Sequence, residues 1–198
     1  MSTSRAISPR VSPLSKRTAA ATTTTRKLTH LNAAAEVHMV AVDAKPETLR
    51  TATASGVVTM SAATVAALRA GTLKKGDALA VARIAGINGA KRAADLIPLC
   101  HPLRLTGIEV TLALRPRAVA ISATVRAFDR TGVEMEALAA VSAAALTIYD
   151  MCKSVDKAMS IERIAVDHKA GGRSGTYRRV GTSAMKTAKR PPARRPAR

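Results

Sequence analysis

Two stretches in the middle of the chain alternate between apolar and polar or small residues. Apolar side chains recur at every second position over residues 108–114 and again over residues 119–125, with Arg-Pro-Arg-Ala between the two stretches. A period of two is the pattern of a β-strand with one buried face, and a break that contains proline is typical of a turn. The pattern therefore predicts a hairpin of two long strands.

Shorter apolar runs predict three further strands. They cover residues 37–42, 57–60 and 159–166, and each run is rich in Val, Ile or Met. β-branched residues favour strands, although runs this short carry little periodicity of their own.

Alanine-rich segments predict three helices. Ser61 is suited to cap a helix over residues 62–70, and a glycine follows the end of that segment. A second helix is expected over residues 77–94, and a third, longer one over residues 133–155. Strands and helices that do not simply alternate indicate an α+β fold with one antiparallel sheet and helices packed on one face. A core built mainly from alanine buries little area per residue, so we also expect subunits to associate.

Positive charge is concentrated at the two ends of the chain. Of the formal net charge of +19, residues 1–27 contribute six basic side chains and no acid, and residues 173–198 contribute nine and no acid. Residues 28–172 hold 17 basic and 13 acidic side chains. Basic segments of low complexity bury too little apolar area to offset their ordering entropy. We therefore expect a disordered tail at 1–27, a folded domain at 28–175 and a disordered tail at 176–198.

The composition narrows the class of protein and its compartment. The tails are either solvated polycations or weak, salt-sensitive binders of nucleic acid. The N-terminal tail is rich in Ser, Thr and Arg, as mitochondrial transit peptides are. The sequence has no run of 18 uncharged apolar residues to suggest a membrane span, and two cysteines are too few for a disulfide framework. A cytoplasmic protein is expected, or one of the mitochondrial matrix if the source is eukaryotic.

Three glycine motifs are candidates for phosphate or nucleic-acid binding. GTLKKGD at 71–77 has an aspartate where a P-loop requires lysine, so it is not a Walker motif. GING at 86–89 matches the GXXG clamp of KH domains, and with the basic tails it supports a rival hypothesis of a nucleic-acid-binding protein. HKAGGRSG at 168–175 joins flexible glycines to cations, which suits either an oligophosphate site or a plain loop.

Cys100 and His101 are adjacent in the string LIPLCHPL at 96–103. A zinc site would require further ligands at metal spacing, which the sequence lacks, so no metal is expected. A Cys–His nucleophile stays open, although adjacent residues of an extended segment rarely face each other. His101 suits an acid, a base or a phosphate donor in a pocket, or else a histidine of the core.

The expected helix at 133–155 carries charged residues at both ends. Asp150 and Lys153 are three positions apart and share a face, either as a surface ion pair or as part of a site. Glu134 and Glu136 lie near the other end, and Glu136 is about 21 Å from Asp150 along the axis. One small substrate cannot reach both ends in one chain. Either a second subunit completes one site, or the two ends belong to different sites.

Four strings resemble one known family, the molybdenum cofactor biosynthesis protein C family of cyclic pyranopterin monophosphate synthases. They are RIAGI at 83–87, LIPLCHPL at 96–103, GVEMEAL at 132–138 and AALTIYDMCK at 144–153. The strings follow the family's order, and the resemblance runs from about Leu28 to Gly175.

The resemblance implies an enzyme, a lyase that uses no cofactor. Members of the family convert 3′,8-cyclo-7,8-dihydroguanosine 5′-triphosphate, made from GTP by a radical SAM cyclase, into cyclic pyranopterin monophosphate with loss of pyrophosphate. The implied fold is ferredoxin-like α+β. The implied assembly is a hexamer, a trimer of dimers, with active sites at the subunit interfaces.

The resemblance also assigns roles to single residues. Lys75 and Lys153 are the implied general acid and base, with pKa values lowered by neighbouring cations and partial burial, and Asp150 orients Lys153. Glu134 and Glu136 are expected to hold amine groups derived from guanine. The other implied substrate-binding residues, mostly cations that would neutralise the triphosphate, are Lys45, Arg50, Lys91, Cys100, His101, Met135 and Lys169.

Two departures from the family's pattern bear on the site. The chain reads MVAVD at 39–43, so Ala41 stands where the family usually has an aspartate. The glycine loop has Ala170 for a usual serine and Arg173 for a usual lysine. Loss of the acid at position 41 is expected to weaken the orientation of the substrate.

Overall fold

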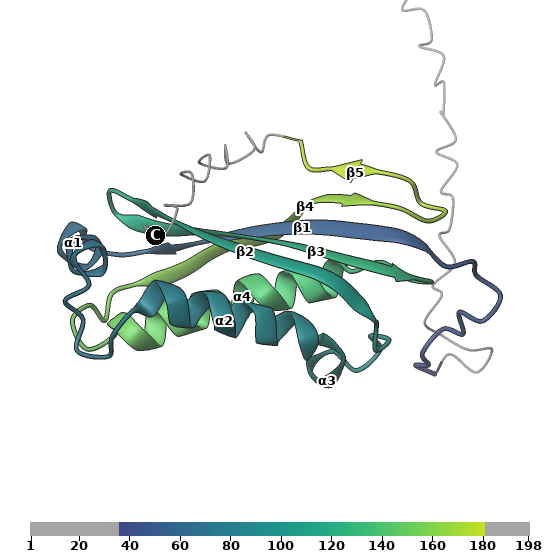
Figure 1. Ribbon diagram of the computed structural model, residues 1–198, viewed down its shortest axis with the longest axis horizontal. Coiled ribbons are helices and arrows are strands. Elements are labelled where there is room, and N and C mark those ends of the chain that lie inside the picture. Colours follow the sequence, from purple (N-terminus) through teal and green to yellow (C-terminus); the bar gives the residue numbers. More distant parts are fainter. Residues whose placement is uncertain (1–35, 181–198) are drawn as a thin grey trace, which may run out of the picture.

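The computed structural model describes residues 36–180. Its strands form one antiparallel sheet, and two long helices lie on one face of that sheet (Figure 1). The elements follow the chain as β1, α1, α2, α3, β2, β3, α4, β4 and β5, and the strands lie side by side in the order β2-β3-β1-β4-β5. The predicted α+β class, with an antiparallel sheet and helices on one face, is confirmed. The tail expected at 1–27 and the positions after 180 lie outside the described residues.

The predicted hairpin is confirmed and is longer than expected. It consists of β2 (Leu105–Arg115) and β3 (Ala118–Asp129), which pair from Arg115 opposite Ala118 to Leu105 opposite Ala127. Every second residue of β3 from Val119 to Ala127 is buried against the helices. The alternation seen in the sequence is thus the alternation of a half-buried strand.

The centre of the sheet is β1 (Thr48–Thr59), which pairs with β3 on one side and with β4 (Ser160–Ala170) on the other. The sequence predicted only the last positions of β1, because most positions before 57 carry Thr, Ala or Ser instead of large apolar residues. The strand predicted over 159–166 is confirmed and continues four residues further. β5 (Tyr177–Arg178) pairs with β4, so the sheet reaches past position 175, where the folded domain was expected to end.

The strand predicted over residues 37–42 is wrong. Only an isolated bridge at Val37 is present there, and the segment leads into a turn in which the backbone N–H of Lys45 donates to the carbonyl of Val42 at 2.9 Å. An apolar run forms a strand only where it can pair along its length with another strand. Here the chain joins the sheet only after the turn, where β1 begins.

The predicted N-caps at Ser61 and Asp77 are confirmed, as is the end of the first helix at Gly71. α1 (Ala62–Ala70) begins where the Ser61 hydroxyl accepts from the N–H of Thr64, and it ends at Gly71 in the left-handed conformation. Asp77 caps α2 (Ala78–Lys91) in the same way. The expected second helix breaks after α2, and the short α3 (Ala93–Leu96) follows. The long helix, α4 (Glu134–Cys152), is confirmed and is shorter than expected at its C-terminal end.

α2 and α4 pack closely because α2 has glycines where the helices meet. Gly86 and Gly89 are buried, and a Cβ added at Gly89 would lie 2.7 Å from the carbonyl oxygen of Ala139 and from the Cβ of Ala143. A nucleic-acid clamp needs these glycines in an exposed loop. The interpretation of GING as a KH-type clamp is therefore wrong.

Within residues 36–180, α4 is the one helix long and apolar enough to cross a membrane. Half of its 18-residue apolar window is buried inside the protein, and a core helix passes the same test of length and composition. Its buried residues include Val141 and Ile148, which contact the sheet side of the core. Burial of such a side chain stabilises the folded protein by about 1.5–3 kcal/mol. α4 is therefore interpreted as a core helix, and the candidate site residues lie at its two ends.

Candidate active site

Lys75, Asp150 and Lys153 meet at the C-terminal end of α4. Lys75 lies in the loop between α1 and α2, and its Nζ donates to the backbone carbonyl of Asp150 at 2.9 Å and to carboxylate oxygen Oδ2 at 2.8 Å. The Nζ of Lys153 is 2.8 Å from the other carboxylate oxygen, Oδ1. All three side chains are about half exposed. The structure thus brings the expected acid–base residues together around one carboxylate.

These contacts shift the pKa values of Asp150 and Lys153 in opposite directions. The hydrogen bonds from Lys153 and Lys75 lower the pKa of Asp150 to about 2. The hydrogen bond and negative charge of Asp150 in turn raise the pKa of Lys153. The sequence predicted a lowered pKa for Lys153, and this is wrong because a carboxylate, not a cation, is its strongest neighbour. Lys153 is held as an ammonium ion and is suited to donate a proton.

A cavity of about 440 Å³ opens beside the other end of α4. Its wall includes Arg173 from the loop after β4 and, beside it, apolar and small residues such as Val40, Val42 and Gly132. The apolar and small residues were missed in the sequence because they carry no charge or nucleophile to mark them. The predicted site residues that line the cavity are Lys45, Cys100, His101, Glu134 and Met135.

Lys169 reaches this cavity's wall through an ion pair. Its Nζ donates to Oε1 of Glu134 at 2.6 Å, which joins β4 to the first turn of α4. Both side chains are mostly buried, at 32% and 24% exposed. Glu134 is thus already paired with a cation, and this pair helps to fix the position of the helix end that faces the cavity.

His101 binds the chain segment that carries two other lining residues of this cavity, Val40 and Lys45. Its Nε2 is 2.9 Å from the carbonyl oxygen of Val40, and a carbonyl only accepts, so Nε2 carries the hydrogen. His101 is therefore a pocket residue, and its ring also ties down the segment that carries Lys45.

Glu136 is buried and faces a second cavity. Only 3% of the residue is exposed, Oε1 accepts from the Cys100 thiol at 3.5 Å, and Oε2 has no hydrogen-bond partner. Burial raises the pKa of Glu136. Burial, followed by the charge of Glu136, raises the pKa of Cys100 to about 11. An activated Cys–His nucleophile is therefore not formed here, because the thiol stays protonated.

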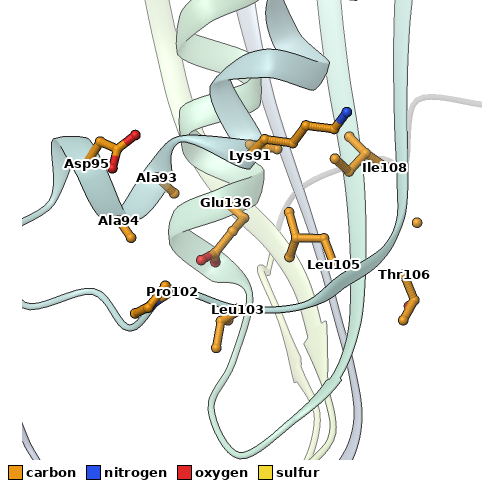
Figure 2. Close-up of a pocket in the computed structure, with 12 residues that line it drawn as sticks. Lys91, Ala93, Ala94, Asp95, Pro102, Leu103, Leu105, Thr106, Ile108 and Glu136 are labelled. Atoms are coloured by element: carbon orange, nitrogen blue, oxygen red, sulfur yellow. The ribbon is translucent and has the colours of Figure 1, made fainter.

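The second cavity has a volume of about 390 Å³ and lies between α2, α3 and the start of β2. Figure 2 shows the Glu136 carboxylate pointing from α4 toward Pro102 and Leu103, while Lys91 of α2 extends toward Ile108. Cys100 lines the first cavity and donates to Glu136, which lines the second. This thiol–carboxyl pair therefore stands between the two cavities.

The two glutamates expected to act together diverge. Positions two apart on a helix point about 200° apart, so Glu134 faces Lys169 and the first cavity, whereas Glu136 faces the second. Of the two glutamates, Glu136 is the one with a buried carboxylate oxygen that has no hydrogen-bond partner.

Arg50 lines neither of these cavities. It is 9% exposed, and its guanidinium donates from Nε to the carbonyl of Asp129 at 3.1 Å and from Nη2 to the carbonyl of Arg130 at 3.0 Å. The sequence predicted a substrate-binding cation, and the structure places it in the framework beneath the glycine loop.

The chemistry thus falls into two groups at opposite ends of α4. The lysine–aspartate group lies at the C-terminal end, and both cavities lie toward the N-terminal end. Among residues 36–180, no group of three or more His, Cys, Asp or Glu side chains is arranged to hold a metal ion.

Comparison with known proteins identifies the family. The MoaC family model matches residues 39–172, which span both groups of residues. The chain belongs to the MoaC family. The chain is 56% identical over 153 residues to cyclic pyranopterin monophosphate synthase 1 of Mycobacterium tuberculosis, which covers 77% of this chain and 90% of that protein. It is 55% identical over 157 residues to the cyclic pyranopterin monophosphate synthase of Streptomyces griseus, which covers 79% of this chain and 89% of that protein.

Proposed function

We propose that this chain is a cyclic pyranopterin monophosphate synthase, a lyase. It converts 3′,8-cyclo-7,8-dihydroguanosine 5′-triphosphate into cyclic pyranopterin monophosphate and releases pyrophosphate, an early step of molybdenum cofactor biosynthesis. The observation that carries the proposal is the 56% identity to a protein of this name over most of both chains. Membership of the MoaC family and the two groups of residues on α4 support it.

The larger cavity suits the triphosphate. Lys45, His101 and Arg173 line it, so two cations and a histidine face one space. The Lys169–Glu134 pair borders the same space and supplies a third cation, whose charge is partly balanced. Cations gathered in a partly buried cavity favour a ligand with about four negative charges.

The second cavity suits the ring derived from guanine. Such a ring presents several N–H groups, and the open Oε2 of Glu136 is a buried acceptor in need of a donor. Cys100 holds the other oxygen of the same carboxyl group. Lys91 lines the same cavity and is proposed to contact the substrate there.

The lysine–aspartate group is proposed to transfer protons. Opening the reduced ring, rebuilding the pterin and closing the cyclic phosphate all require protons to move. Lys153, kept protonated by Asp150, is the proposed general acid. Lys75 shares the same carboxylate and is the proposed second proton-transfer group.

One site requires residues from two copies of the chain. The C-terminal and N-terminal groups lie at opposite ends of a 19-residue helix, which is too long for one small substrate to bridge. We therefore propose a homo-oligomer, a trimer of dimers, in which the lysine–aspartate group of one copy completes the cavities of another. Exposed apolar side chains on the outer faces of the helices, Ile84 and Leu146, support association. We further propose a ferredoxin-like topology, which the strand order β4-β1-β3-β2 and the presence of helices between β1 and β2 and between β3 and β4 support.

The proposed setting is the cytoplasm, where GTP is available and the two free cysteines stay reduced. The substrate would come from a radical SAM GTP cyclase. Contact of the basic tails with nucleic acid is proposed to be non-specific only, because within residues 36–180 the one candidate clamp is a buried part of α2.

The proposed activity is tested by supplying the cyclic triphosphate to the purified full-length chain. The pterin product is measured by its fluorescence after oxidation, and pyrophosphate is measured in parallel. Equal amounts of both products are expected. Absence of both, under conditions in which the synthase of M. tuberculosis works, would contradict the proposed function.

A further inference from the structure

Arg50 occupies a position where three segments of the chain meet. It belongs to β1, and its guanidinium reaches the carbonyls of Asp129 and Arg130, where the chain leaves β3 for α4. The same guanidinium lies under the turn that follows β4: a Cβ placed on Gly172 would overlap its Nη1 atom. One buried side chain therefore connects the β3–α4 turn to the glycine loop.

The glycine loop is shaped to fit over this arginine. Gly171 and Gly172 both have positive φ, at 102° and 72°, which side chains rarely adopt. A Cβ on Gly171 would overlap the carbonyl oxygen of Leu49, the residue before Arg50. Two neighbouring glycines are thus required by the backbone conformation and by the closeness of β1.

Both segments that Arg50 connects carry residues of the larger cavity. The β3–α4 turn leads to Gly132 and Glu134, and the glycine loop has Lys169 before it and Arg173 after it. The Lys169–Glu134 ion pair spans the same two segments at 2.6 Å. The spacing between the walls of the cavity therefore depends on the contacts of Arg50.

We infer that Arg50 is a positioning residue that fixes the glycine loop against the β3–α4 turn and so sets the place of Lys169 and Arg173. It does not serve as a ligand of the phosphates. A planar guanidinium has several fixed donors and can bind two carbonyls while its face packs against the glycine turn, whereas a lysine ammonium cannot. The inference rests on the proposed function, because the positioned residues are those assigned to the substrate.

The test compares two variants. Arg50→Lys keeps the positive charge and removes the two guanidinium donors, and Gly172→Ala keeps Arg50 and displaces the glycine loop. Arg126→Lys is the matched control, since Arg126 is an exposed arginine of β3 beside the position that pairs with Arg50. For each variant we would measure kcat, inhibition by pyrophosphate, the melting temperature and the rate of trypsin cleavage after Arg173.

Both test variants are expected to lower kcat by about tenfold to a hundredfold, because small displacements of binding groups cost that much. Pyrophosphate inhibition is expected to change by the same factor in both variants, to within about threefold, because both displace the same cations of the cavity. Cleavage after Arg173 is expected to accelerate in both variants, and the double variant is expected to be no worse than either single one, because both break the same unit. Arg126→Lys is expected to match the wild type.

Three results would overturn the inference. A tenfold weakening of pyrophosphate inhibition in Arg50→Lys, without one in Gly172→Ala, would make Arg50 a phosphate ligand. If both test variants have a lower melting temperature but normal kcat and a normal rate of cleavage after Arg173, Arg50 contributes only to the stability of the fold. The same conclusion follows if both test variants fail to fold while Arg126→Lys folds. The cleavage rates need no turnover, so if the wild type makes no product, the role of Arg50 is still tested separately from the proposed function.

Discussion

Lys75 and Asp150 are joined by two hydrogen bonds although 75 positions separate them in the chain. One bond goes to the carboxylate, and the other goes to the backbone carbonyl in the last turn of α4. One ammonium group therefore balances the partial negative charge at the C-terminal end of the helix. It also donates to a backbone carbonyl that has no partner within the helix. Lys153 takes the remaining carboxylate oxygen, so the three residues form one unit.

Removing either lysine is expected to stop turnover without unfolding the protein. In Lys75→Ala and Lys153→Ala, kcat is expected to fall by about 10²–10⁴-fold, the usual contribution of a positioned proton-transfer group. The melting temperature is expected to stay within error, since exposed ion pairs stabilise little. Lys74→Ala, a change at the exposed neighbouring position, is the control and is expected to keep full activity. Near-normal kcat in both lysine variants would refute the assigned roles.

The pH dependence of turnover reports the contact between Asp150 and Lys153. Asp150 raises the pKa of Lys153, so the protonated acid persists to higher pH and is lost as the pH rises through that pKa. In Asp150→Asn the pKa of Lys153 is expected to fall, and the alkaline limb of the kcat profile is expected to move to lower pH. Glu109→Gln, at an exposed site on β2, is the control. An alkaline limb that stays in place would exclude Lys153 as the acid.

Cys100 is expected to resist alkylation in the folded protein. With a pKa of about 11, its thiolate fraction at pH 8 is about a hundredfold below that of a free thiol. Mass spectrometry after iodoacetamide treatment, with urea-unfolded protein as the reference, measures this directly. Glu136→Gln removes a charge that raises the pKa, so it is expected to speed the reaction. Alkylation of the native thiol at the unfolded rate would contradict the buried thiol–carboxyl pair.

Gly89→Ala is expected to destabilise the protein, although alanine is the better helix former by about 1 kcal/mol. The added Cβ would lie 2.7 Å from a carbonyl oxygen of α4, and such overpacking costs about 1–3 kcal/mol. Gly107→Ala is the matched control, because a Cβ there would come no closer than 3.9 Å to a neighbour. Chemical denaturation measures both. A more stable Gly89→Ala variant would show that the helices are not in close contact at this point.

The elements that the sequence predicted well are those with a local signal. The alternation in β2 and β3, and the caps at Ser61 and Asp77, arise within a few residues and needed no tertiary information. The first half of β1 was missed because its strand character comes from pairing on both sides, not from its own Thr- and Ala-rich sequence. The run at 37–42 failed for the converse reason, since it has the composition of a strand and forms only an isolated bridge at Val37.

The site shows the same division. Asp150 and Lys153 could be placed together from helical spacing alone, whereas Lys75 joined them through the resemblance to the family. The pKa of Lys153 could not be predicted, because it depends on which charge lies nearest in space. Arg50 was expected to contact the substrate through the resemblance to the family, and a sequence does not display the two carbonyls to which its guanidinium donates.

The most direct test of a site shared between two copies mixes two inactive variants. Lys75→Ala damages the group at one end of α4, and Glu134→Gln damages the cavity at the other end. In oligomers formed by refolding an equal mixture, about one quarter of the sites would combine an intact group with an intact cavity. The proposal predicts about a quarter of wild-type activity from this mixture. It predicts no recovery from Lys75→Ala mixed with Lys153→Ala, because both changes fall in the same group. No recovery in the first mixture, or equal recovery in both, would contradict the shared site.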